Sequence, residues 1–189
     1  MTRIQNASGF TMVEMAISLV IFTLLASSLL SLSLKSSKFM GTNDAEVAVQ
    51  LEGNRALSRM TEVLRKTGRV DDGVTVYPRV VNGGQELEFR ILEDIDGNGY
   101  PFEEWTGNLE WSPKVFTLKK DENANLRLFN GTNTVFHLGR YVHNLSFQTV
   151  IEDPALHFKE IRVTFETRRP TDEGYDVVHS IDASIHMRN

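Results

Sequence analysis

The sequence contains no cysteine, which excludes disulfide bonds, thiolate zinc sites and cysteine nucleophiles. It also lacks an excess of positive charge, because 20 Lys and Arg residues stand against 25 Asp and Glu residues and the net charge is −5. A protein that binds nucleic acid needs a basic face for the phosphates, so this balance argues against that class. The 189 residues leave room for one ordinary domain and an extension.

Signatures of common catalytic sites are missing as well. The chain has no GxSxG, HExxH, Walker A or GxGxxG motif. Its histidines are spread over strand-like segments without the spacing of a metal site: His137, His143, His157, His179 and His186. We therefore expect a protein that is not an enzyme.

Charged residues are nearly absent from the N-terminal segment. Residues 1–34 contain only Arg3 and Glu14, and residues 15–34 form an uncharged run of 20 without glycine or proline. A run of this length is just sufficient to cross a membrane as a helix. A secretory signal peptide has a shorter apolar region and no carboxylate at its start. The sequence therefore predicts a retained transmembrane helix.

Residues 6–14, NASGFTMVE, resemble the processing signal of type IV pilins and pseudopilins. That signal is a short polar leader ending in glycine, followed by Phe-Thr-x-x-Glu at the start of a long apolar helix. The resemblance implies that prepilin peptidase cleaves after Gly9 and that the new amine of Phe10 is methylated. The alternative is a single-pass anchor in which GFTMVE occurs by accident.

Glu14 is expected to act in assembly. A carboxylate inside a membrane-spanning segment costs about 2.5–3.5 kcal/mol on insertion scales, and this cost makes such a residue a functional hypothesis. When helices pack side by side, the Glu14 carboxylate of one chain can meet the Phe10 amine of the next chain. Each buried charge would then have a partner, so we expect Glu14 to select for assembly and to set the axial register.

An amphipathic helical pattern follows the apolar run. Between residues 42 and 67, apolar side chains recur at mixed three-, four- and six-residue intervals: Val47, Leu51, Leu57, Met60 and Leu64. Gly68 is suitably placed to end this helix. Gly41 and Gly53 are expected to be flexible points within it.

Alternating apolar and polar residues then predict strands up to the end of the chain. The predicted strands cover residues 74–81, 87–91, 114–120, 125–129, 134–138, 145–151, 161–165 and 175–187. Such alternation is typical of an antiparallel meander whose apolar face packs against a helix. We predict an α+β fold of the type IV pilin-like kind, with one long N-terminal helix, half transmembrane and half amphipathic, packed on an antiparallel β-sheet.

These patterns divide the chain into four parts. We expect a prepilin leader at 1–9, a transmembrane helix at 10–34, an amphipathic continuation at 35–67 and a β-rich domain at 68–189. The flanking charges do not set the orientation, because Arg3 and the initial amine nearly balance Lys35 and Lys38. The pilin resemblance does set it, with the leader in the cytoplasm, a single span in the bacterial inner membrane and a periplasmic C-terminal domain.

The C-terminal half resembles the PilW/PulJ type of pilin-like protein. Three segments carry this looser resemblance: Val142–Phe147, Ile161–Val163 and the final pair Arg188 and Asn189. Many major pilins carry glycine or proline in the membrane helix and a C-terminal disulfide, and this sequence has neither. The resemblance therefore implies a minor pilin or pseudopilin near the tip of a type IV pilus or type II secretion pseudopilus.

The resemblance also implies partners and leaves alternatives open. The implied partners are other minor subunits, the major subunit, prepilin peptidase, the inner-membrane assembly platform and membrane lipid. A major pilin is the alternative within the same class, and a single-pass tethered periplasmic enzyme or binding module is the alternative from another class. The sequence does not distinguish a pilus from a secretion system or a DNA-uptake apparatus.

One acidic loop suggests a metal. Residues 94–100, DIDGNGY, match the first seven positions of an EF-hand-type calcium loop. The twelfth position needs a bidentate glutamate, and here it is Trp105, so a true EF-hand is not expected. An ordinary turn of Asp, Gly and Asn explains the same residues without a metal. On the calcium hypothesis the ligands are Asp94, Asp96, Asn98, Tyr100 and Glu104.

Overall fold

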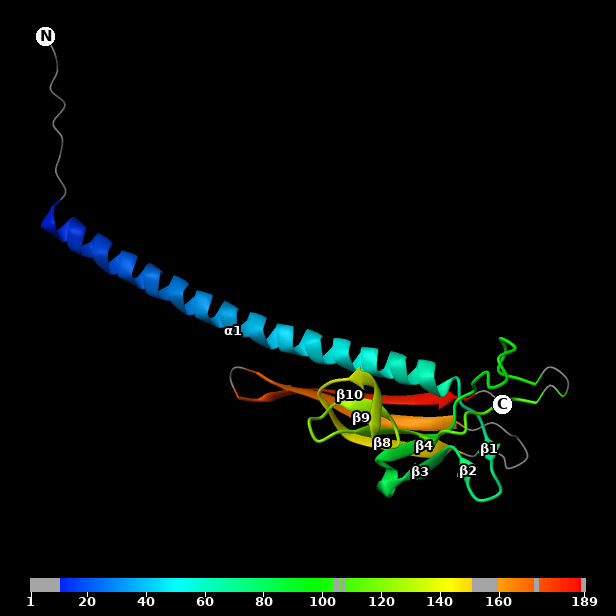
Figure 1. The fold of residues 1–189 in the computed structure, drawn as a ribbon. Helices are drawn as coiled ribbons and strands as arrows, with labels where there is room; N and C mark the ends of the chain where they lie inside the picture. The colour runs from blue at the N-terminus through cyan, green and yellow to red at the C-terminus, as the bar shows by residue number, and fades with distance from the viewer. Residues whose placement is uncertain (1–10, 104–105, 107, 151–159, 172–173, 188–189) are drawn as a thin grey trace, which may run out of the picture. The chain divides into compact units, whose positions relative to one another are not determined.

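The computed structural model describes residues 11–103, 106, 108–150, 160–171 and 174–187. One long helix, α1 (Met12–Leu64), is followed in the described residues by ten strands, all of which pair antiparallel (Figure 1). The α+β class predicted from the sequence is confirmed. The chain divides into two units, Met1–Asn43 and Asp44–Asn189, and the division falls inside α1.

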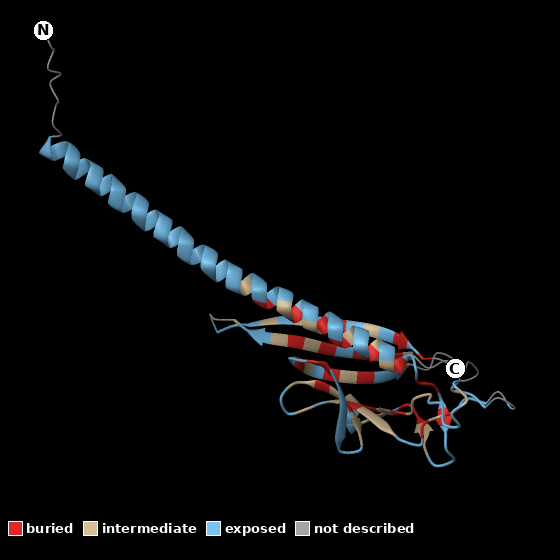
Figure 2. Ribbon diagram, turned by 45° about the horizontal axis from the view of Figure 1, so that its top comes forward, coloured by how far each residue is buried: buried red, intermediate tan, exposed pale blue. Residues whose placement is uncertain are grey.

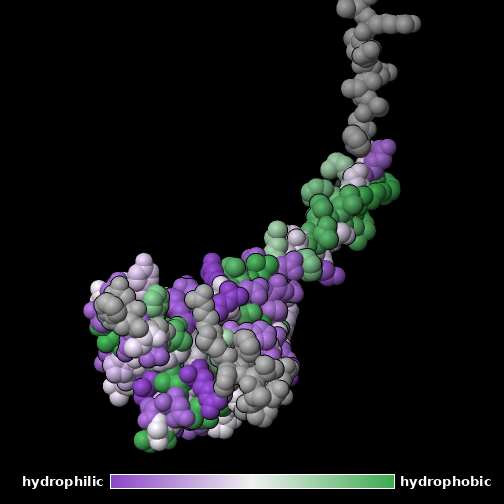
Figure 3. Space-filling view, turned by 90° about the vertical axis from the view of Figure 1, so that its right-hand side faces the viewer, coloured by the Kyte–Doolittle hydropathy of each residue, from purple (hydrophilic) through white to green (hydrophobic). Residues whose placement is uncertain are grey.

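The first part of α1 carries the apolar run. Every residue from 12 to 40 is exposed, and Figure 3 shows mainly hydrophobic side chains along this part, with hydrophilic ones towards its ends. By length and composition, α1 contains a segment able to cross a membrane, and none of that segment is buried in the structure. Within it, the hydroxyls of Thr23, Ser27 and Ser28 donate to carbonyls of the preceding turn, as Thr23 does to Val20 and Ser28 does to Leu24, both at 2.8 Å. These hydroxyls therefore need no water.

The second part of α1 buries a stripe of mainly small residues. Its buried positions recur every three or four residues: Ala45, Val49, Gly53, Ala56, Met60 and Leu64 (Figure 2). The expected stripe is only partly correct, because Val47 and Leu51 are exposed while Met60 and Leu64 are buried. Small side chains let the helix lie close to the sheet, and a pattern of large apolar residues does not reveal such a face.

Gly53 is a close-packing position on this stripe. A Cβ atom added there would lie 2.7 Å from Cδ1 of Ile181 and 3.1 Å from Oγ1 of Thr167. The Thr167 hydroxyl donates a hydrogen bond of 3.0 Å to the carbonyl of Val49, which fixes the helix on the sheet. The helix is continuous through both Gly41 and Gly53. The structure thus explains Gly53 by packing, where we expected a flexible point.

Two larger sheets form the rest of the domain. A three-stranded sheet has the order β10-β9-β8, made of β8 (Val142–Val150), β9 (Glu160–Pro170) and β10 (Asp176–His186). A five-stranded sheet has the order β3-β4-β5-β6-β7, made of β3 (Arg79–Val81), β4 (Glu86–Phe89), β5 (Phe116–Lys120), β6 (Leu126–Asn130) and β7 (Asn133–Gly139). The expected strand at 74–81 is wrong as a single element. Pro78 separates β2 (Val76–Tyr77), which pairs with β1 (Val70–Asp71), from β3.

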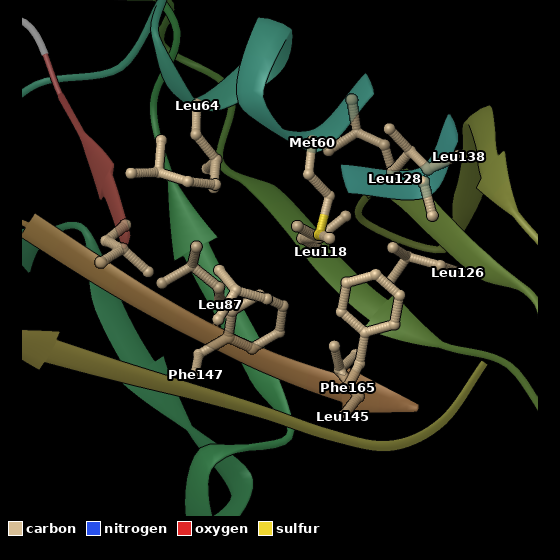
Figure 4. Close-up of a cluster of buried hydrophobic side chains, with 14 of the residues drawn as sticks. Met60, Leu64, Leu87, Leu118, Leu126, Leu128, Leu138, Leu145, Phe147 and Phe165 are labelled. Atoms are coloured by element: carbon tan, nitrogen blue, oxygen red, sulfur yellow. The ribbon is translucent and has the colours of Figure 1, made fainter. Parts of the chain in front are cut away.

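The hydrophobic core of the second unit draws on α1 and on both sheets. Met60 and Leu64 of α1 meet leucines from the five-stranded sheet, with Phe147 of β8 and Phe165 of β9 on the other side (Figure 4). Alternation along β9 points Ile161, Val163 and Phe165 inward, as the sequence predicts. Fully burying each such side chain contributes about 1.5–3 kcal/mol to folding.

Candidate functional site: the N-terminal segment and an acidic loop

Glu14 and Thr11 cap the start of α1. The Thr11 amide and hydroxyl both donate to Oε2 of Glu14 at 2.9 Å, and the Glu14 amide donates to the Thr11 hydroxyl at 3.3 Å. This reciprocal arrangement is a capping box, which satisfies amides that the first helical turn leaves without partners. Sequence reasoning missed this role of Glu14, although the Thr-x-x-Glu spacing before an apolar run indicates it. The other oxygen, Oε1, makes no hydrogen bond with the described residues.

The predicted processing residues Gly9 and Phe10 lie outside the described residues. We expect cleavage after Gly9, so the mature chain should lose nine residues and begin with a methylated Phe10. Mass spectrometry of the protein from the membrane fraction measures both changes. A Gly9→Val variant should keep its leader, because a branched side chain crowds the backbone that the peptidase must reach. An intact chain beginning at Met1 in cells that hold the peptidase would contradict the prediction.

The predicted calcium loop forms part of a longer excursion between β4 and β5. Antiparallel bridges join Leu92 to Trp111 and Phe102 to Leu109, so the two legs of the excursion run side by side. Backbone hydrogen bonds also join the two legs, because the Glu93 amide donates to the Glu110 carbonyl at 3.2 Å. The acidic residues of the first leg consequently face Glu110 on the second.

Aspartate side chains shape the turn itself. Asp94 accepts hydrogen bonds of 2.8 Å from the amides of Gly97 and Gly99, one on each carboxylate oxygen. Asp96 accepts a bond of 3.0 Å from the Asn98 amide. Gly97 and Gly99 have φ angles of 79° and 89°, a left-handed conformation that favours glycine. The DIDGNG sequence thus folds as a tight loop whose carboxylates are held in place.

Glu110 places a third carboxylate beside those of Asp94 and Asp96. It is only 7% exposed, and its Oε2 accepts a hydrogen bond of 2.5 Å from the Ile95 amide. Its Oε1 is buried without a hydrogen-bond partner among the described residues. One carboxylate oxygen from each of Asp94, Asp96 and Glu110 lies within 4.8 Å of the others. Sequence reasoning missed Glu110, whose only signal is a carboxylate between apolar Leu109 and Trp111.

The other residues expected as ligands have different positions. The Asn98 side chain takes part in the turn, since its Oδ1 accepts from the Tyr100 amide at 2.7 Å and its Nδ2 donates to Asp96 and to the Phe102 carbonyl. The exposed Tyr100 ring packs against Phe102 with ring centroids 5.3 Å apart. Glu104 lies outside the described residues, so its role as a ligand stays a prediction.

A second acidic turn in the same domain contains a carboxylate, Asp121, whose negative charge is balanced by hydrogen bonds and by a basic side chain. Asp121 accepts hydrogen bonds from Asn123 and Asn125, and Arg127 lies 2.7 Å from its carboxylate. Burial opposes ionisation of Asp121, but the hydrogen bonds from Asn125 and the charge of Arg127 outweigh it and lower the pKa. In the described part of the chain, no basic side chain forms an ion pair with Asp94, Asp96 or Glu110.

The comparisons with known proteins concern the N-terminal segment. A family model described as the prokaryotic N-terminal methylation motif matches residues 4–30, which include the expected cleavage position, Glu14 and much of the apolar run. No curated protein and no solved structure matches the chain. The matched motif and the long apolar helix before antiparallel sheets support the same class of protein.

The motif at residues 4–30 therefore supports a type IV pilin-like protein. Its motif implies processing by prepilin peptidase and assembly with other pilins, and it points to a structural subunit rather than an enzyme. Its apolar N-terminal helix supports anchoring in a membrane.

Proposed function

We propose that this protein is a minor pilin or pseudopilin, which helps to initiate or cap assembly of a type IV pilus or a type II secretion pseudopilus. The methylation motif at residues 4–30 carries the proposal, because it supports a pilin-type subunit. The minor role rests on the sequence. The sequence has no cysteine that could form the C-terminal disulfide of many major pilins, and it has no glycine or proline in residues 15–34. Its C-terminal half resembles the PilW/PulJ type.

In this proposal the protein is anchored in the inner membrane before assembly, with its C-terminal domain in the periplasm. The assembly platform then moves it into a filament, where the Glu14 carboxylate pairs with the Phe10 amine of a neighbouring subunit. The exposed apolar surface of α1 from Met12 onward would leave lipid for contacts with other helices of the same kind. A subunit that starts the filament would remain near its tip, in contact with other minor subunits and the major subunit.

Subunit counting and gene deletion test this function. We expect quantitative mass spectrometry of sheared filaments to find the protein at a small fraction of the major subunit. Deletion of its gene should reduce the number of filaments without reducing the amount of major subunit in the membrane. Complementation with the wild-type gene is the control.

Other outcomes would contradict the proposal. A copy number equal to that of the most abundant subunit would identify a major pilin. Absence from filaments, with filament number unaffected by the deletion, would favour a tethered periplasmic enzyme or binding module.

A further inference from the structure

We propose that the loop between β4 and β5 binds a calcium ion through the carboxylates of Asp94, Asp96 and Glu110. The site differs from an EF-hand, because its third carboxylate comes from the opposite leg of the excursion and not from the twelfth position of the loop. Binding of this ion goes beyond the proposed role in filament assembly and does not depend on it.

The buried oxygen of Glu110 is the first reason. A carboxylate that is 93% removed from solvent (100 minus 7) normally has hydrogen bonds or a cation at both oxygens, yet Oε1 has no partner among the described residues. Oε2 is already occupied by the Ile95 amide, which holds the carboxylate beside the aspartates. A cation bound by Oε1 as well as by the two aspartates would supply the missing interaction.

The charge of the cluster is the second reason. One oxygen from each of the three carboxylates lies within 4.8 Å of the others, so their charges repel; Asp94 and Asp96 are exposed, and Glu110 is buried. Two less buried aspartates of the described domain each lie beside a basic side chain, Asp121 beside Arg127 and Asp72 beside Arg90, each at 2.7 Å. The cluster of Asp94, Asp96 and Glu110 has no such neighbour among the described residues, so a cation from solution would add to the compensation that backbone amides already give these carboxylates.

Ligand chemistry and spacing select calcium among the common cations. Calcium binds oxygen ligands at about 2.3–2.6 Å, so two ligands of one ion lie at most about 5 Å apart. The separation of 4.8 Å or less within the cluster is compatible with that limit. Histidine and cysteine, which transition metals prefer, are absent from the cluster. Magnesium requires a small, nearly ideal octahedron, which fits poorly with carboxylates brought from two legs of a loop.

The surface beside the cluster leaves room for the remaining ligands. A hollow of about 540 Å³ is lined by Asp96, Glu103 and Glu110, with Trp111 at its wall. Water can therefore complete the six to eight oxygen ligands that calcium takes. Because the ion would join the turn at Asp94 to the second leg at Glu110, its binding should stabilise the folded excursion.

Thermal unfolding of the full chain in detergent tests the proposal. Extracellular calcium sites have dissociation constants of about 10⁻⁴–10⁻³ M, so 10 mM CaCl₂ should raise the ratio of folded to unfolded protein about 11-fold for a constant near 1 mM. This corresponds to a rise in melting temperature of about 3–6 °C relative to excess EGTA. Magnesium chloride at the same concentration should give a much smaller rise.

Variants locate the site. Glu110→Gln preserves the size of the side chain and the acceptor for the Ile95 amide, but it removes the buried charge. We expect this variant to be at least as stable as the wild type in EGTA and to gain nothing from calcium. Glu122→Gln is the matched control, because it removes one exposed acidic charge at the other acidic turn. It should keep the full response to calcium.

Two results would overturn the proposal. One is a wild-type melting temperature that does not change between EGTA and 10 mM calcium (about ten times the constant of a weak extracellular site), and the other is an equal response in the Glu110→Gln variant. If Glu110→Gln does not fold, calorimetric titration of the wild type with CaCl₂ decides, and so does a variant carrying Asp94→Asn with Asp96→Asn. Heat of binding in the wild type that disappears in the double variant supports the site, and no heat in the wild type refutes it.

Discussion

Glu14→Gln should produce a subunit that is inserted, cleaved and folded but missing from filaments. The substitution keeps the shape of the side chain and an oxygen that can accept from the Thr11 amide, as Glu14 Oε2 does at 2.9 Å. Insertion should not suffer, because the change removes a charge that costs about 2.5–3.5 kcal/mol within the membrane. Pairing with the Phe10 amine of a neighbour is lost, and that amine is left without a partner in a medium of low dielectric. The protein recovered in sheared filaments should therefore fall to background while its amount in the membrane stays constant.

The structure supplies the control for this experiment. Glu14 also caps α1, so its replacement could act through the helix end instead of through pairing. Thr11→Ala removes the capping hydroxyl, at a cost of about 0.5–2 kcal/mol, but keeps the carboxylate. We expect the Thr11→Ala protein to enter filaments nearly as well as the wild type. Equal loss of assembly in both variants would assign the role of Glu14 to capping, and normal assembly of Glu14→Gln would refute the pairing model.

Local patterns in the sequence predict most of this fold. The apolar run and the alternation of Ile161, Val163 and Phe165 each depend on neighbours within a few residues, and both appear in the structure as expected. The strand predicted at 74–81 fails because a single proline divides β-rich residues between two sheets. The buried stripe of α1 is mispredicted because Gly53 and Ala56 are buried through tertiary contacts that hydrophobicity alone does not show.

The candidate sites follow the same division between local and distant information. Asp94 and Asp96 are found from their spacing in one turn, and the Thr-x-x-Glu spacing of Thr11 and Glu14 indicates their cap in the same way. Glu110 comes to Asp94 only because bridges such as Leu92 to Trp111 align the two legs of the excursion. No spacing rule predicts which of several later acidic residues will face the loop. The buried, unpartnered oxygen of Glu110 becomes visible only in three dimensions.

Gly139→Ala should destabilise the second unit strongly, because a methyl group there meets the helix. A Cβ atom at Gly139 would lie 2.5 Å from Cβ of Ala56 and 3.4 Å from its Cα, and both residues are buried. The alanine methyl has no torsion that could move it aside, so α1 or β7 must shift. Arg59 resists such a shift, since its guanidinium donates to the carbonyls of His137 and Leu138 at 3.2 and 3.3 Å.

Overpacking of this kind costs about 1–3 kcal/mol, and the rigid contact places Gly139→Ala near the upper end. For a chain of this size the melting temperature should fall by about 6–12 °C, as measured by thermal unfolding of the full chain in detergent.

The partner substitution Ala56→Gly tests the cause. Alone it should cost about 1 kcal/mol through helix propensity, but combined with Gly139→Ala it makes room for the new methyl group. The double variant should therefore be more stable than Gly139→Ala alone, with a favourable interaction of about 0.5–3 kcal/mol between the two sites. Simple addition of the two single costs would show that the contact between Gly139 and Ala56 does not limit the packing of α1 on β7.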